Sequence, residues 1–219
     1  MGVEINLLKN YPKTKRNTKD RAEKKSKEDI AIARKFDKEY FDGDRRYGYG
    51  GYQYNSKFWE PVVPDFIKHF NLSNNSSILD VGCGKGFALY DFKKALPGLE
   101  VQGIDISNYA IDNAKEEVRS FLTLGNATNL PYPDNYFDCV ISIVTLHNLD
   151  RADCAKGLSE IERVSKGKSF ITLDAYADLN EKKLMEEWNL TALTVMHVDD
   201  WKKFFEENNF NGDYYWFKP

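Results

Sequence analysis

Two aspartates on either side of a glycine-rich turn are the residues whose types and spacing could do chemistry. Asp80 precedes Gly82 by two residues in the stretch Ile-Leu-Asp-Val-Gly-Cys-Gly-Lys-Gly, and Asp105 ends the next apolar run about 20 residues beyond the turn. Glycines let the backbone bend sharply and let a ligand approach without a Cβ in the way. The two oxygens of Asp105 could accept hydrogen bonds from both hydroxyls of a ribose. The pattern therefore predicts a nucleoside-type ligand above this turn.

The order of residues in the turn separates the common ligands of such sites. A phosphate-binding Walker loop needs Ser or Thr after Gly-Lys, and here Gly86 follows Lys85. The dinucleotide pattern GxGxxG also fails, because the third glycine comes one residue early. Asp80 would repel a pyrophosphate, whereas it suits a phosphate-free ligand that carries an ammonium and a sulfonium. These features argue against an NAD-dependent oxidoreductase.

A third segment of interest lies further along the chain. After another apolar run, Asn126 and Ala127 begin a loop rich in turn residues, and a second apolar run follows. The three segments together resemble motif I, the acidic loop and the post-loop strand of class I S-adenosylmethionine-dependent methyltransferases, in particular the small-molecule branch similar to methyltransferase type 11. The resemblance extends over residues 77–173. It implies S-adenosylmethionine as cofactor, bound at the carboxyl edge of a seven-stranded sheet.

Carried over position by position, this resemblance implies a part for each matching residue. The residues of the turn would lie beside the methionine part of the cofactor, and Ile143 would lie near its amino group. Asp105 would bind the ribose, Ile106 would pack on the adenine, and Asn126 would border the adenine edge. The family often has Asp where this chain has Asn126, but the amide oxygen can still accept from the adenine amino group. The implied cofactor-binding residues are Asp80, Gly82, Cys83, Gly84, Asp105, Ile106, Asn126, Ala127 and Ile143.

His147 is the candidate for acid–base chemistry. Methyl transfer requires the protein to align donor and acceptor at roughly 3–3.5 Å and to exclude water. His147 follows the expected fourth strand, at the strand end where ligands gather in open α/β sheets. It resembles a histidine that is frequent at this place in the family, and we predict an active-site base or hydrogen-bond partner. The other interpretation, that the ring only fixes its own loop, is left open.

A tract rich in tyrosine and glycine, residues 40–54, precedes the first core strand. It is too rich in glycine for a helix and too rich in aromatic residues for a linker. We predict that it folds over the cofactor, with Tyr49 and Tyr52 as catalytic residues that present rings or hydroxyls to the sulfonium. Tyr47 would join them at the cofactor, and Arg46 would clamp the cofactor carboxylate or an anionic acceptor. An aromatic lid packed only for stability is the alternative.

The chain before this tract is basic. Ser26 then begins a helical pattern whose apolar face is Ile30, Ala33, Phe36 and Tyr40. We interpret the segment as a solvated arm that leads into an amphipathic helix packed on the domain. A lid or a contact to an anionic substrate is the more specific interpretation.

Secondary-structure elements must position these residues. In the sequence, apolar runs alternate with helical stretches, and such alternation predicts parallel βα units. We expect a Rossmann-like α/β fold with helices on both faces of a mostly parallel sheet, an antiparallel last strand and an N-terminal helical and aromatic lid. Residues 1–58 would form the arm, helix and lid, and residues 59–219 the methyltransferase domain. The expected strands are Ser77–Val81, Glu100–Ile104, Phe121–Leu124, Phe137–Ile143, Ser169–Leu173 and Tyr214–Phe217. The expected helices are Trp59–Phe70, Phe87–Ala95, Asn108–Glu117, Arg151–Val164 and Asp199–Asn208.

Because the chain stops at Pro219, the number of strands is left open. Six strands, or an edge filled by another segment or a second subunit, would both fit. A homodimer is left open for the same reason.

Composition sets the broad class. Hydrophobic residues make up 42% and charged residues 30% of the chain, which is typical of a globular protein. No apolar run is long enough to span a bilayer and no secretory signal is evident, so we expect a cytoplasmic protein without a membrane partner. The cysteines lack metal-ligand spacing, so we expect no metal and free, partly buried thiols. The net charge of −3 argues against general binding to nucleic acid.

The sequence therefore predicts an enzyme that transfers the methyl group of S-adenosylmethionine to an oxygen or nitrogen of a small, polar, anionic metabolite. A nucleotide-linked compound or a precursor of a surface glycan would suit that description. The rival from another class is a non-catalytic S-adenosylmethionine-binding partner or sensor. An NAD-dependent oxidoreductase and an RNA methyltransferase guided by the basic arm are less favoured.

Overall fold

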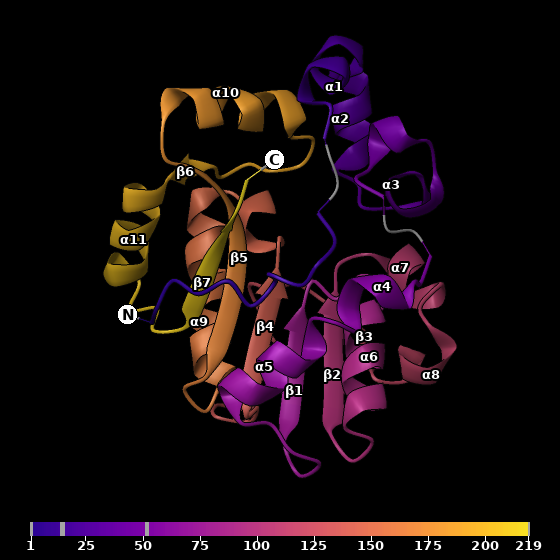
Figure 1. Cartoon of the computed structure of the whole chain (residues 1–219), viewed down its shortest axis with the longest axis vertical. Helices are drawn as coiled ribbons and strands as arrows, with labels where there is room; N and C mark the ends of the chain where they lie inside the picture. The colour runs from indigo at the N-terminus through magenta and orange to yellow at the C-terminus, as the bar shows by residue number, and fades with distance from the viewer. Residues whose placement is uncertain (1, 14–15, 51–52, 219) are drawn as a thin grey trace.

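One parallel sheet organises the chain, and the carboxyl ends of its strands meet at a single edge (Figure 1). The computed structural model describes residues 2–13, 16–50 and 53–218. Within these residues the strands follow the order β3-β2-β1-β4-β5-β6, and β7 pairs with β5. The strands are β1 (Ser77–Val81), β2 (Glu100–Asp105), β3 (Leu122–Leu124), β4 (Cys139–Ile143), β5 (Ser169–Tyr176), β6 (Met196–His197) and β7 (Asp213–Phe217).

Helices cover both faces of the sheet, as predicted. On one face, Leu158 and Trp201 bury apolar surface against β4 and β5; on the other, Phe66 and Phe92 pack against β1 and β4. Apolar burial of this kind is the main favourable term in folding. The helices along the sheet are α5 (Val63–Phe70), α6 (Phe87–Ala95), α7 (Asn108–Asp112), α8 (Glu116–Arg119), α9 (Arg151–Val164), α10 (Leu179–Trp188) and α11 (Val198–Glu207).

The direction of the last strand corrects the sequence-based prediction. β7 pairs with β5 in parallel, from Asp213 opposite Phe170 to Phe217 opposite Asp174, so the predicted antiparallel orientation is wrong. The physical reason is α11, which lies between β6 and β7 and carries the chain back to the starting end of the sheet. A crossover helix of this kind joins parallel strands, whereas antiparallel neighbours need only a hairpin. The described residues thus form seven strands rather than six.

The N-terminal part of the chain lies over the carboxyl edge of the sheet as short helices (Figure 1). Ser26 begins one of them as predicted: its Oγ accepts the Asp29 N–H at 3.0 Å, and Asp29 Oδ2 accepts the Ser26 N–H at 2.8 Å. The helix does not continue to Tyr40, because Phe36 adopts φ +49° and Asp37 caps a new helix. These elements are α1 (Thr18–Lys24), α2 (Lys27–Ala33), α3 (Lys38–Asp42), the 3-10 turn η1 (Arg45–Tyr47) and α4 (Ser56–Trp59).

The start of the chain is part of the main body. The Ile5 N–H donates to the Tyr214 carbonyl at 2.9 Å, so this segment extends the sheet beside β7. Leu7 is buried in the same apolar layer as Phe66. The domain boundary at residue 58 stays a prediction.

Two further expectations concern membranes and cysteines. Among the residues with a described structure, no helix is both long enough and apolar enough to cross a bilayer.

Cys83, Cys139 and Cys154 are buried free thiols, as predicted. Burial raises the pKa of all three thiols, so they stay protonated at neutral pH.

Candidate functional site

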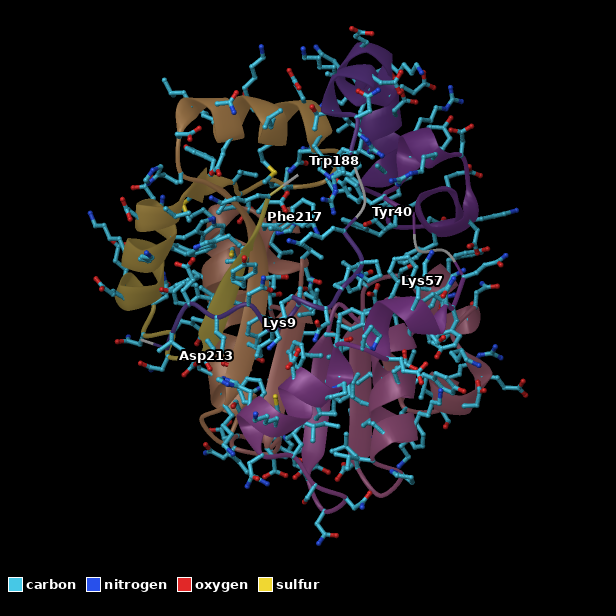
Figure 2. The ribbon with its side chains drawn as sticks, in the orientation of Figure 1. Lys9, Tyr40, Lys57, Trp188, Asp213 and Phe217 are labelled. Carbon is cyan, nitrogen blue, oxygen red and sulfur yellow. The ribbon has the colours of Figure 1, made fainter. Side chains whose placement is uncertain are left out.

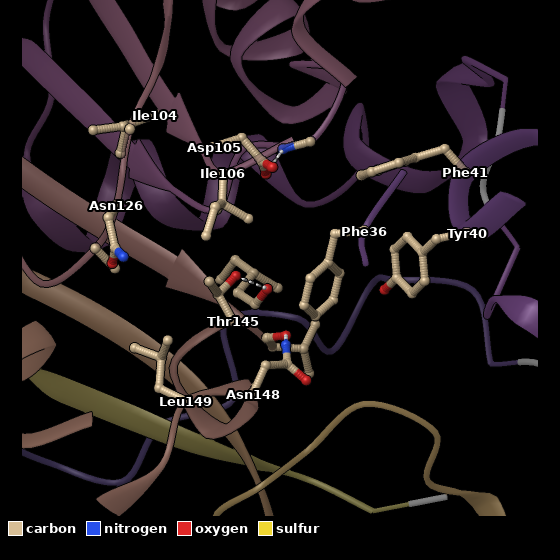
Figure 3. A pocket seen from close by; sticks show the side chains of 16 residues that line it. Phe36, Tyr40, Phe41, Ile104, Asp105, Ile106, Asn126, Thr145, Asn148 and Leu149 are labelled. Carbon is tan, nitrogen blue, oxygen red and sulfur yellow. Dashed lines mark hydrogen bonds between the residues drawn. The ribbon is translucent and has the colours of Figure 1, made fainter. Parts of the chain in front are cut away.

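A pocket opens at the carboxyl ends of β1, β2 and β4, between the sheet edge and the lid (Figure 3). Side chains of the sheet loops form one wall and aromatic side chains near α3 form the other. Seven of the predicted cofactor residues lie here, namely Gly82, Gly84, Asp105, Ile106, Asn126, Ala127 and Ile143. The remaining lining residues are Phe36, Tyr40, Phe41, Ile104, Gly125, Val144, Thr145, Asn148 and Leu149.

The turn after β1 depends on its glycines. Gly82 has φ +86°, and a Cβ there would lie 2.1 Å from Thr145 Oγ1. A side chain at this position would therefore both strain the backbone and collide with the loop after β4. The adjacent Cys83 side chain is buried in the core layer and does not line the pocket. Only its backbone is near the site, so a contact from Cys83 to the cofactor stays a prediction.

Asp80 lies beneath the turn as a buried carboxyl. It is 5% exposed, and its Oδ1 has no hydrogen-bond partner in the described structure. Burial, with a smaller contribution from the nearby Asp105, raises the pKa of Asp80 to about 7. A buried carboxylate oxygen without a partner favours an added cation, because ionisation would then be compensated.

Asp105 ties the turn to the end of β2. Its Oδ2 accepts the Gly84 N–H at 2.7 Å (Figure 3). Its Oδ1 accepts the Ser107 N–H at 2.9 Å. Burial raises the pKa of Asp105, although these backbone hydrogen bonds act in the opposite direction. Each carboxylate oxygen has a second lone pair, so Asp105 can still accept two hydrogen bonds from a ligand in the pocket.

Apolar side chains line the pocket beyond Asp105. Ile106 is 58% exposed, which is unusual for an isoleucine, and its side chain faces the pocket. Ala127 and Leu149 lie among the residues that line it from the β4 side. The Asn126 Oδ1 already accepts two hydrogen bonds from Thr128, at 3.0 and 3.1 Å. The amide NH2 of Asn126, rather than the oxygen that we expected, is therefore the group that can still form a hydrogen bond with a ligand.

Phe36, Tyr40 and Phe41 form the lid side of the pocket, and sequence reasoning missed them as site residues. Their signal was present, because Phe36 and Tyr40 were read as an apolar helix face that packs on the domain. The structure turns that face toward the cavity (Figure 3). The break at Phe36 causes this, since α3 starts anew in a different direction.

Asp42 fastens this lid wall to the turn. Lys85 Nζ donates to both of its oxygens, at 2.6 and 2.7 Å, and the Tyr109 hydroxyl donates to Oδ2 at 2.8 Å. Burial opposes the ionisation of Asp42, but the hydrogen bonds from Lys85 and Tyr109 outweigh it and hold the pKa below its usual value. We call this group, Asp42 with Lys85 and Tyr109, the lid latch.

The loop after β4 supplies Val144, Thr145 and Asn148 to the pocket, but not His147. Asn148 Oδ1 is a buried acceptor without a hydrogen-bond partner among the described residues. His147 is 4% exposed, and its Nδ1 accepts the Asp174 N–H at 3.0 Å. Burial lowers the pKa of His147 to about 3, so the ring is neutral at physiological pH.

This arrangement fixes the tautomer of His147. Since Nδ1 accepts, the proton is on Nε2, which lies 3.5 Å from Asp174 Oδ1. The His147 carbonyl also accepts the N–H groups of Leu193 and Thr194. These contacts agree with a ring that holds its own loop, and the role of His147 as a base stays a prediction.

The predicted lid residues lie apart from the pocket lining. The Tyr49 hydroxyl accepts the Leu190 N–H at 2.7 Å, so it ties the lid to the chain after α10. Arg46 is exposed and lies beside Tyr47 and 3.7 Å from Asp29. Tyr52 falls outside the described residues. Direct parts for Arg46, Tyr47, Tyr49 and Tyr52 at the cofactor or in catalysis stay predictions.

Among the residues placed in the structure, no group of three or more His, Cys, Asp or Glu side chains could hold a metal ion.

Comparison with known proteins identifies this arrangement. A family model described as a methyltransferase domain matches residues 79–173, which include the turn, Asp105 and the pocket loop of β4. Residues 79–173 are thus similar to the methyltransferase domain of class I, S-adenosylmethionine-dependent methyltransferases. S-adenosylmethionine is the cofactor of this family.

The curated relatives of this chain have names that point to different acceptors. A demethylmenaquinone methyltransferase from Symbiobacterium thermophilum is 36% identical over 53% of this chain and 49% of that protein. A tRNA (carboxymethyluridine(34)-5-O)-methyltransferase from Arabidopsis thaliana is 31% identical over 64% of this chain and 33% of that protein. The chain thus spans half or less of the length of these two relatives.

Solved structures support the fold of this chain. The YcgJ protein from Bacillus subtilis aligns with a TM-score of 0.55 at 20% identity, over 67% of this chain and 66% of that one. At this identity the likeness concerns the fold alone, because one fold serves many activities.

Proposed function

We propose that this protein transfers the methyl group of S-adenosylmethionine to an oxygen or nitrogen atom of a small, polar, anionic metabolite. The observation that carries the proposal is the pair of buried carboxylates at a glycine turn, Asp80 with an unpartnered oxygen and Asp105 with free lone pairs in the pocket. A cation beside Asp80 and a ribose at Asp105 would satisfy both groups. A pyrophosphate would satisfy neither.

The residues of the pocket fit this cofactor. Asp105 would accept hydrogen bonds from the ribose hydroxyls, and Ile106 would cover one face of the adenine while Leu149 lies across from it. Gly82 lets the turn pack closely on Thr145, where a Cβ would collide with the loop after β4. Asp80 would balance the positive charge of the methionine end.

When bound, S-adenosylmethionine supplies an electrophilic methyl group on sulfur. The protein then has to exclude water and hold the acceptor in line with that bond. Phe36, Tyr40 and Phe41 supply an aromatic cover on the lid side of the pocket. The buried Asn148 Oδ1 is the nearest candidate to accept a hydrogen bond from the hydroxyl or amine of the acceptor.

A protein that binds the cofactor without turnover is the alternative from another class. The position of His147 supports it, because this predicted base is buried and its Nδ1 already accepts the Asp174 N–H. An amine acceptor that binds in its neutral form needs no such base. An RNA acceptor is a further alternative, since one relative by its name acts on tRNA.

Following labelled methyl groups tests the proposal. The protein is incubated with methyl-labelled S-adenosylmethionine and a fractionated metabolite extract, and with RNA from the same cells. We expect label in an acidic small-molecule fraction, and loss of that label in the Asp105→Ala variant. Label in RNA would favour the RNA alternative. Saturable cofactor binding with no transfer to any fraction would favour the binding protein.

A further inference from the structure

Three aromatic rings form the lid side of the pocket. Phe36, Tyr40 and Phe41 face the wall that carries Asp105 and Ile106 (Figure 3). Tyr40 lies between the short N-terminal helices and the carboxyl ends of the strands (Figure 2). Its ring centroid is 5.1 Å from that of Phe36 and 5.0 Å from that of Phe41, so it contacts both. We call Phe36, Tyr40 and Phe41 the aromatic wall.

Phe41 lies against the glycine turn. A Cβ placed on Gly84 would be 3.4 Å from Phe41 Cε1, which is van der Waals distance. The Gly84 N–H donates to Asp105 at 2.7 Å, so this residue of the turn has an aromatic ring and a carboxylate beside it. The family resemblance implies that the methionine part of the cofactor, with its sulfur, lies beside the same turn.

Phe36 reaches the pocket from a strained backbone position. Its φ of +49° lies in the left-handed region, which a bulky side chain rarely adopts. The Phe36 N–H donates to the Ala33 carbonyl at 3.1 Å, just beyond the end of α2, where glycine is the usual left-handed residue. Strain of this kind concentrates at functional sites. The ring that lines the pocket is therefore a candidate for the function that the strained position serves.

Both sides of the pocket attract positive charge. Aromatic faces are the negative part of the ring quadrupole, and Asp105 lines the opposite wall. Asp80 Oδ1, below the turn, has no hydrogen-bond partner in the described structure. Among the described residues that line the pocket, none is a lysine, arginine or histidine. The Lys85 ammonium is paired with Asp42 in the lid latch. A ligand with a positive charge near the turn is thus attracted by both walls, whereas a neutral ligand of the same shape is not.

We propose that Phe36 and Phe41 bind the positive charge on the sulfur of S-adenosylmethionine, so that the pocket prefers this sulfonium to the neutral sulfur of S-adenosylhomocysteine. The inference rests on the proposed function, since it names the part of the cofactor that the aromatic wall contacts. It assigns to these two rings the cation–π contact that the sequence led us to expect from Tyr49 and Tyr52. It also extends the cofactor site beyond residues 79–173, the part that the family model matches.

The consequence concerns turnover. The methyl group leaves the sulfur as the acceptor is methylated, and the sulfur then loses its positive charge. The product S-adenosylhomocysteine therefore lacks an attraction that the donor has, which favours its exchange for a new donor molecule.

Titration calorimetry with three ligands that differ at one position tests the inference. S-adenosylmethionine has a sulfonium, sinefungin has a carbon that bears an ammonium group at the same place, and S-adenosylhomocysteine has a neutral sulfur. We expect the wild-type protein to bind each cationic ligand about threefold more tightly or more than S-adenosylhomocysteine. In the Phe41→Leu variant this ratio should fall toward one, because leucine keeps an apolar side chain but has no ring face.

Three further variants separate the ring from the fold. Phe41→Tyr keeps a ring and should keep the wild-type ratio. Phe36→Gly should lower the ratio while the midpoint of urea unfolding changes little, because relief of the left-handed strain offsets the lost contacts of a partly exposed ring. Phe58→Leu is the matched control, since this partly exposed ring on α4 is not among the described lining residues, and its ratio should be that of the wild type.

Two results would overturn this inference while leaving the proposed function standing. One is a wild-type protein that binds S-adenosylmethionine and sinefungin no more tightly than S-adenosylhomocysteine. The other is a Phe41→Leu variant that keeps the wild-type ratio, which would make the aromatic wall a cover for the methyl acceptor. Absence of saturable binding of all three ligands to the wild-type protein would instead contradict the proposed function.

Discussion

At the scale of single residues, two buried carboxyl groups lie at the centre of the proposed cofactor site. Asp105 accepts hydrogen bonds from the Gly84 and Ser107 N–H groups, whereas Asp80 Oδ1 has no partner in the described structure. Asp105 is therefore already oriented for a ligand, and Asp80 would gain a partner when a cation binds.

The pH dependence of cofactor binding follows from Asp80. Its pKa of about 7 means that a cationic ligand must displace a proton at lower pH. We expect S-adenosylmethionine affinity to fall by up to about tenfold between pH 8 and pH 6, since only about a tenth of the carboxyl is then ionised. Titration calorimetry in buffers of different ionisation enthalpy would also detect the released proton.

The Asp80→Asn variant should lose this dependence while keeping the size of the side chain. Asp174→Asn is the matched control, because Asp174 is also buried with a pKa of about 7 but belongs to β5 rather than to the strand that leads into the glycine turn. The contribution of Asp80 to folding stability depends on pH in the opposite direction to its contribution to cofactor binding. Its raised pKa favours the folded protein at low pH, and this contribution is lost as pH rises through about 7. Equal pH dependence in Asp80→Asn and wild type would contradict the assignment.

At the scale of elements, sequence patterns predicted the helix bounds that local interactions determine, but not the features that depend on tertiary contacts. The helices Phe87–Ala95 and Arg151–Val164 have the predicted bounds; the glycine turn leads into the first, and Asp150 caps the second. The helix expected over Asn108–Glu117 is broken, since the Lys115 N–H donates to the Lys85 carbonyl in the glycine turn. No feature of the local sequence indicates this tertiary hydrogen bond. The direction of β7 was missed for a similar reason, because it depends on the crossover through α11.

The lid latch is the element that we expect to control cofactor release. Asp42 is an ionised, partly buried side chain that accepts three hydrogen bonds, and the Asp42→Asn variant loses its charge. A hydrogen bond to a charged group contributes about 1.5–3 kcal/mol. We expect S-adenosylhomocysteine to dissociate about tenfold faster or more, measured by stopped-flow fluorescence. Hydrogen exchange in α2 and α3 should accelerate in parallel.

Glu39→Gln provides the control for the latch. It lies on the same helix and removes the same charge, but its side chain is exposed. This variant should behave as the wild type does. An Asp42→Asn protein with an unchanged dissociation rate would show that the lid moves independently of the turn.

At the scale of the whole molecule, the fold class was predictable because composition, alternation and motif spacing all pointed to the same architecture. The lid was predictable as a segment, but its inner wall was not, since Phe36 turns the chain with a positive φ that sequence alone does not indicate. The match to a methyltransferase domain covers residues 79–173, so the lid belongs to the part of the chain outside it.

Stability of the whole molecule should depend on the packing of α11 against the sheet. Trp201 is fully buried, and its Nε1 donates to the Asp174 carbonyl at 3.0 Å. Trp201→Ala should lower the free energy of unfolding by about 3–5 kcal/mol, measured by urea denaturation. Leu179→Ala, at a side chain that is 84% exposed, should change it by less than about 0.5 kcal/mol. A small effect at Trp201 would mean that α11 is not part of the cooperative core.

The most direct test of the account is a calorimetric titration of the purified protein with S-adenosylhomocysteine, and with NAD+ in parallel. We expect saturable binding of S-adenosylhomocysteine at one site, at least tenfold weaker binding in a folded Asp105→Ala variant, and no binding of NAD+. Asp112→Ala, an exposed change on α7, should bind as the wild type does. Binding of NAD+ without S-adenosylhomocysteine, or equal affinity in the Asp105→Ala variant, would contradict the claim that the two carboxylates and the glycine turn hold an adenosyl sulfonium.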